Sequence, residues 1–101
     1  MNLDDERTEA VARMWRDHVS LPFPGRLRSV DVAGVELAML DADVAGHVSF
    51  WLDNRGCLDD RRRNALATRE RQLDTVIPEL TGEEAAYFRH LLDMAVLVLE
   101  A

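Results

Sequence analysis

Lysine is absent from this chain of 101 residues, and cysteine occurs once. All twelve basic residues are therefore arginine, which reflects either a codon bias or a need for the planar, bidentate guanidinium group. A single cysteine, Cys57, excludes an internal disulfide bond. A reducing compartment, the cytoplasm, is the expected location.

Long apolar runs are also missing. No run approaches the roughly 18–20 residues that span a bilayer, so we expect no membrane segment. The acidic start, residues 1–6, lacks the basic and apolar regions of a signal peptide. The 48% hydrophobic content is too high for a disordered chain of net charge -7. These features predict one soluble domain, residues 1–101, with a single core.

Residues 4–19 are predicted to form an amphipathic helix that begins with acidic residues. Its apolar residues recur at helical spacing: Leu3, Val11, Met14, Trp15 and Val19. Residues 21–25, Leu-Pro-Phe-Pro-Gly, end this helix and separate it from the rest of the chain. The helix either docks on the core or forms an arm that binds a partner.

The apolar period then changes from about four to two, which predicts a β-hairpin. Its strands would be 28–32 and 35–40, joined by the two-residue turn Ala33-Gly34. This register sets Asp31 opposite Glu36, a like-charge pair that costs stability unless an arginine lies nearby or the register differs. Two strands alone are marginal in water, so their apolar side must pack on helices or on a partner.

Three further helices are predicted, over residues 42–53, 60–76 and 82–99. Asp41 or Asp43 would cap the first, and Asp59 the second. Thr81 and Glu84 have the spacing of a capping box for the third. The order helix, hairpin, helix, helix, helix belongs to the α+β class and is mainly α.

The last helix has an unusual composition, because residues 94–99 are apolar on every side. One interpretation is burial against a second copy of the chain, through Leu92, Val96 and Leu99. The alternatives are a central helix that its own domain surrounds, or a C-terminal strand added to the hairpin.

Arginine is concentrated in residues 55–71, where six arginines and three acids give a local charge of +3 while the rest of the chain carries -10. One interpretation is a solvated basic face, with Arg62 and Arg69 laid along the edge of the core. The other is a polar site that binds a phosphate, an acidic peptide or nucleic acid, for which Arg61, Arg62, Arg63 and Arg69 are the candidates.

A nucleic-acid-binding function is the second hypothesis. Residues 42–76 have the helix, glycine-containing turn and helix of a helix-turn-helix unit, with Arg61, Arg62, Arg63 and Asn64 as potential groove contacts. Asp59 and Asp60 at the same helix start, and the net charge of -7, weigh against binding to a polyanion. The same pattern also fits an ordinary antiparallel pair of helices.

Catalytic and metal-binding patterns are weak. The three histidines lie on three different predicted helices, and no His or Cys pair has a metal-ligand spacing. We therefore expect no enzyme activity, metal or cofactor. A third hypothesis, a small-ligand binder or enzyme, would need a pocket near His47, Trp51 and His90.

The favoured hypothesis is a small, acidic, cytoplasmic interaction or regulatory protein. It would self-associate as a dimer through its apolar C-terminal helix and bind a protein partner. Neither a membrane nor nucleic acid is the expected partner.

Overall fold

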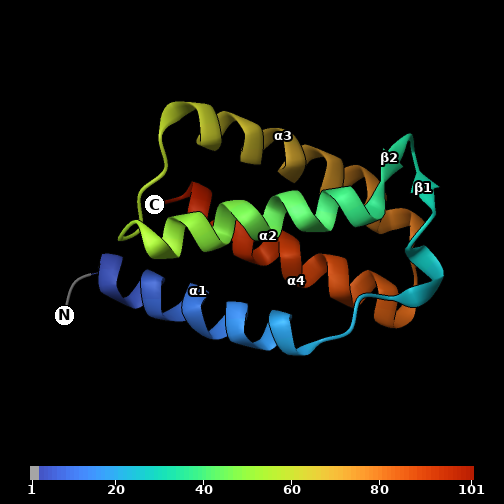
Figure 1. Ribbon diagram of the computed structural model, residues 1–101, viewed down its shortest axis with the longest axis horizontal. Coiled ribbons are helices and arrows are strands. Elements are labelled where there is room, and N and C mark those ends of the chain that lie inside the picture. The colour runs from blue at the N-terminus through green and yellow to red at the C-terminus, as the bar shows by residue number, and fades with distance from the viewer. Residues whose placement is uncertain (1–2) are drawn as a thin grey trace.

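The structure, a computed structural model, describes residues 3–101 and contains four helices that run alternately in opposite directions (Figure 1). They are α1 (Leu3–Ser20), α2 (Leu37–Asp53), α3 (Asp60–Val76) and α4 (Gly82–Leu99). Short 3₁₀ turns lie at Gly25–Leu27 and Ile77–Glu79. The predicted α+β, mainly helical architecture is confirmed, and the predicted bounds of α3 and α4 agree with the structure. Met1 and Asn2, at the start of the segment predicted to lack a signal peptide, lie outside the described residues.

The hairpin is shorter than predicted. Strands β1 (Asp31–Val32) and β2 (Val35–Glu36) pair in the predicted register, with Asp31 opposite Glu36. Both acidic side chains are exposed, so water screens their repulsion. The turn residues Ala33 and Gly34 both have positive φ, at 52° and 78°, as a type I′ turn requires.

Residues 37–40 begin α2 instead of extending the second strand, which corrects the predicted start at residue 42. Asp41 and Asp43 lie inside α2, and Glu36 takes the N-cap position. The reason is that apolar residues recur every three to four positions from residue 37 onward. These residues are fully or almost fully buried: Leu37, Leu40, Val44, Val48 and Trp51. The apolar alternation of residues 35–39 concealed the start of this helical stripe.

Helix α4 lies against the other three helices, and all three contribute to one core. Its residues Phe88, Leu91, Met94, Ala95 and Val98 are fully buried. The centre of this core also contains fully buried residues from the other segments: Val11 of α1, Leu66 and Leu73 of α3, and Leu27 after the proline-rich segment. No helix within residues 3–101 is long and apolar enough to cross a membrane.

The turn between α2 and α3 requires glycine at position 56. Gly56 has φ +77°, and its N–H donates a hydrogen bond of 2.8 Å to the Trp51 carbonyl. A Cβ at this position would lie 3.3 Å from Cζ2 of Trp51, a side chain that is only 1% exposed. Both the backbone conformation and the packing therefore disfavour a larger residue.

Replacing Gly56 with alanine is expected to lower the free energy of unfolding by about 1–3 kcal/mol, because alanine must adopt the left-handed conformation and displace the Trp51 ring. Gly46, in the middle of α2 with open space around its Cα, supplies the matched control. Gly46→Ala is expected to raise stability by about 0.5–1 kcal/mol. Denaturant unfolding of both variants measures the difference, and effects of the same sign would contradict this account.

Candidate functional site

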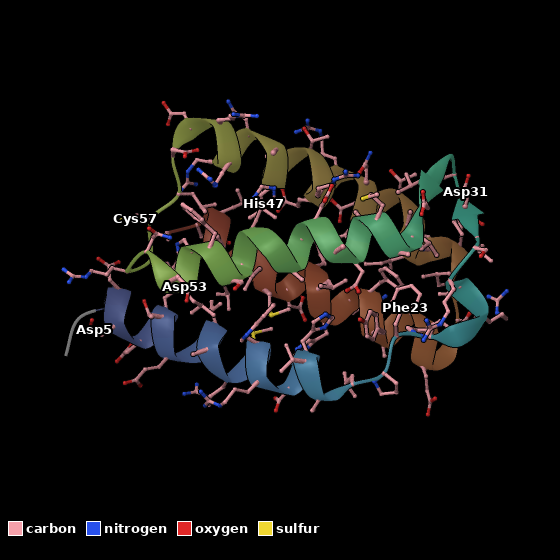
Figure 2. The ribbon with its side chains drawn as sticks, viewed as in Figure 1. Asp5, Phe23, Asp31, His47, Asp53 and Cys57 are labelled. Carbon is pink, nitrogen blue, oxygen red and sulfur yellow. The ribbon has the colours of Figure 1, made fainter. Side chains whose placement is uncertain are left out.

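A cavity of about 770 Å³ opens between the proline-rich segment 21–26 and the first half of α4. Phe23 and Pro24 line it on one side, and Tyr87 and His90 line it on the other. Figure 2 shows Phe23 directed from the connecting segment toward the helices. A volume of this size and a wall that combines apolar, aromatic and a few polar groups are typical of small-ligand sites.

Aromatic packing holds the proline-rich segment in place. The Phe23 ring stands edge-on to Tyr87 and to Phe88, at centroid distances of 5.7 and 6.1 Å. Leu27, four residues later, is fully buried and anchors the far end of the segment. Because prolines 22 and 24 also restrict φ, this side of the cavity is built from a stiff segment of chain.

An ion pair at the rim joins the segment to α4. Arg26 Nε and Nη2 donate hydrogen bonds of 2.8 and 2.6 Å to the two carboxylate oxygens of Glu84. These hydrogen bonds, aided by the charge of Arg26, lower the pKa of Glu84. The predicted capping box is wrong: within residues 3–101 the Thr81 side chain, at the N-cap position, caps no backbone donor, and the Glu84 carboxylate pairs with Arg26. The pattern instead marks a tertiary contact.

Beneath the cavity lies a buried polar cluster formed by His18, Asp41 and Tyr87, from three different helices. Asp41 Oδ1 lies 3.1 Å from His18 Nε2 and accepts a hydrogen bond of 3.1 Å from the Tyr87 hydroxyl. Because Oδ1 can only accept from His18, the histidine carries its proton on Nε2. His18 Nδ1 is buried and has no partner among the described residues. Burial, together with the charge and hydrogen bond of Asp41, raises the pKa of Tyr87.

His90 connects this cluster to the cavity. The ring of His90 stacks on that of His18, with the ring centroids 6.0 Å apart. Its Nε2 lies 2.8 Å from the Met14 carbonyl oxygen. The carbonyl accepts a hydrogen bond from Nε2–H, so Nδ1 is the nitrogen that carries the lone pair when the ring is neutral. His90 also forms part of the cavity wall.

The structure does not bring His47, Trp51 and His90 into one pocket, which corrects that prediction. His47 lines a separate cavity of about 310 Å³ with Arg61, Arg62 and Ala65. Trp51 belongs to the core. The sequence places His47 and Trp51 one helical turn apart, but α2 turns His47 toward α3 whereas His90 packs beside α1.

Three of the four arginines predicted as a polar site are engaged within the chain. Arg62 pairs with Asp59 and stacks 3.8 Å from the centre of the Phe50 ring. Arg69 pairs with Asp43.

Arg63 extends to the end of the chain. Its Nη1 and Nη2 donate hydrogen bonds of 2.6 and 3.1 Å to the carbonyls of Leu99 and Ala101. It therefore satisfies the Leu99 carbonyl at the C-terminus of α4, which has no partner within the helix, and also binds the Ala101 carbonyl two residues beyond. The fourth arginine, Arg61, is exposed, and nothing in residues 3–101 forms a hydrogen bond or ion pair with its side chain.

Helices α2 and α3 run in opposite directions and contact one another (Figure 1). This arrangement fits an ordinary antiparallel pair of helices. Nucleic-acid binding by residues 42–76 stays a prediction.

The three predicted contact residues of α4, Leu92, Val96 and Leu99, are half-buried. Leu92 and Leu99 pack against the core of their own chain. The central position of α4 explains its apolar composition within one chain, so this composition no longer requires a second copy. Self-association stays a prediction.

In the described part of the chain, no group of three or more His, Cys, Asp or Glu residues is arranged to hold a metal ion. Comparison with protein-family models, with curated proteins and with solved structures finds no match for the chain.

Sequence reasoning missed the polar cluster. Asp41 is 23 residues from His18 and 46 from Tyr87, so no local spacing relates them. The only signal was that Tyr87 is the single tyrosine of the chain.

Proposed function

We propose that this protein binds a small aromatic ligand that carries a positively charged or hydrogen-bond-donating group, in the cavity between segment 21–26 and α4. The observation that carries this proposal is the cavity itself, about 770 Å³ with Phe23 and Tyr87 in its wall. Two aromatic side chains favour an aromatic guest through offset or edge-to-face contacts.

The polar groups of the cavity select the rest of the ligand. His90 in the wall has an acceptor nitrogen when its ring is neutral, and Glu83 at the rim is exposed. Arg26 and Glu84 neutralise one another, so Glu83 leaves the rim with a negative charge. A ligand with an amine is therefore favoured over one with a carboxylate.

The hydrogen bonds of the buried cluster support a binding role. Tyr87 donates to Asp41, and His90 is held by the Met14 carbonyl. These bonds fix both wall residues before any ligand enters, which lowers the entropic cost of binding.

Tryptamine and indole-3-acetate provide the test, because both have an indole ring and they carry opposite charges. In ¹H–¹⁵N NMR titrations, tryptamine is expected to cause saturable shifts at residues 23, 87 and 90. Indole-3-acetate is expected to bind about fivefold more weakly or not at all, because the rim repels it.

Ala86 is exposed and lines the cavity, so Ala86→Trp would fill the site with an indole ring from the protein itself. We expect this variant to weaken tryptamine binding about tenfold or more. Ala42, an exposed alanine of α2, gives the matched control: Ala42→Trp should leave the affinity within about twofold. Equal effects of the two substitutions, or shifts that never saturate, would refute the proposal.

A further inference from the structure

The second cavity lies between α2 and the first turns of α3 and has a volume of about 310 Å³. His47 faces it from α2, between the two helices in Figure 2, and Arg61, Arg62 and Ala65 face it from α3. Three of these four side chains carry N–H donors, and two of them are permanently charged guanidinium groups.

The neighbouring carboxylates are already held by other partners. Asp59 accepts a hydrogen bond of 2.8 Å from the backbone N–H of Arg62 and pairs with the Arg62 side chain. Asp43 pairs with Arg69. Arg61 has an exposed guanidinium group. Its charge contributes to the lowered pKa of Asp59, but within residues 3–101 it forms no hydrogen bond or ion pair.

The pKa of His47 depends on its burial and on the charges around this cavity. Burial lowers its pKa, and the charges of Arg62 and Arg69 lower it further, whereas Asp43 and Asp59 act in the opposite direction. The ring is therefore neutral at pH 7, and it offers one donor and one acceptor.

We propose that this cavity binds a phosphoryl group, with Arg61 as the principal contact and Arg62 and His47 as further donors. A phosphoryl group has three or more oxygens that accept hydrogen bonds, and guanidinium groups bind it through paired N–H donors. The cavity is at the lower limit of the roughly 300–1,000 Å³ found for ligand sites, which fits a phosphate ion or a small phosphate ester. This site is separate from the aromatic cavity, and neither proposal depends on the other.

Inorganic phosphate and glycerol 3-phosphate are the probes, added separately at constant ionic strength maintained with sodium chloride. The shift of the His47 ring proton on Cε1 is expected to saturate with either probe. The measured pKa of His47 should rise when the site is filled, because a bound anion favours the imidazolium form. Tighter binding of glycerol 3-phosphate would identify an ester as the ligand, and equal affinities would identify free phosphate.

Arg61→Gln removes the principal contact from an exposed position, and we expect it to weaken binding about fivefold or more. Arg71→Gln, an exposed arginine later in α3, changes the net charge by the same amount and should keep the affinity within about twofold. Equal losses in the two variants would mean non-specific screening and would overturn the proposal. A linear, non-saturating shift or an unchanged His47 pKa would also overturn it.

Discussion

Replacing Asp41 with alanine is expected to lower the free energy of unfolding by about 2–4 kcal/mol, because two buried donors lose their shared acceptor. His18 and Tyr87 are only 5% and 7% exposed, whereas 19% of the Asp41 side chain is exposed, so water would replace the carboxylate only in part. The Tyr87 hydroxyl lies 3.4 Å from His18 Nε2 and could donate to it only if the histidine proton moved to Nδ1. That proton would then be buried without an acceptor. Denaturant unfolding followed by circular dichroism measures the loss.

Asp43 provides the matched control, because it lies two residues later in α2 and its carboxylate pairs with Arg69 at a half-exposed position. Asp43→Ala is expected to cost no more than about 1 kcal/mol. Asp41→Asn retains an oxygen that can accept both hydrogen bonds and should recover most of the stability lost in Asp41→Ala. Equal losses in Asp41→Ala and Asp43→Ala would show that the cluster has no special role.

The cluster of His18, Asp41 and Tyr87 also makes stability depend on pH in the alkaline range. The pKa of Tyr87 is raised in the folded state, chiefly by burial and then by Asp41. Its contribution to stability is therefore complete below the unfolded value of about 10, and it is lost as the pH rises from there toward the folded pKa. The chain has no lysine and one tyrosine, so this decline should be assignable to Tyr87 and absent in Tyr87→Phe.

Replacing Phe88 with alanine is expected to cost about 3–5 kcal/mol, the largest effect that we expect for a single substitution. Phe88 is fully buried where α4 meets the proline-rich segment, and its ring contacts those of Phe23 and Tyr87. Truncation would leave a cavity that the packed helices cannot fill. A domain of this size is stable by about 5–15 kcal/mol, so a large share of that stability would be lost.

Phe50 is the matched control for Phe88, because it is half-buried and packs under the Arg62 guanidinium group. Phe50→Ala should cost about 1–2 kcal/mol, from partial burial and the lost cation–π contact. Unfolding curves for both variants test whether Phe88→Ala loses more stability than Phe50→Ala. A Phe88→Ala protein as stable as Phe50→Ala would contradict the central position of α4.

Local signals in the sequence were sufficient for most of the helices. Asp59 caps α3 as predicted, and Pro78 lies in the 3₁₀ turn that ends it. The start of α2 was misjudged, because residues 35–39 alternate in a way that suits a strand while Leu37 and Leu40 already belong to a helical stripe. A short window of sequence cannot separate these two periods.

The arginine-rich segment, residues 55–71, shows that local sequence also fails to predict which residues pair with a side chain. Its position in α3 and the direction of Arg62 and Arg69 toward the core edge followed from helical spacing alone. Their partners did not, because Phe50 and Asp43 come from α2 and are brought into contact by the antiparallel packing of the two helices.

Local sequence patterns predict the helical class, the hairpin register and the bounds of α3 and α4, because caps, turns and hydrophobic periods act over a few residues. Tertiary structure decided that α4 is central, that His18, Asp41 and Tyr87 form one cluster, and that segment 21–26 closes over an aromatic cavity. These contacts join residues that are 23 to 76 positions apart, and only the packing of the helices against one core sets their distances.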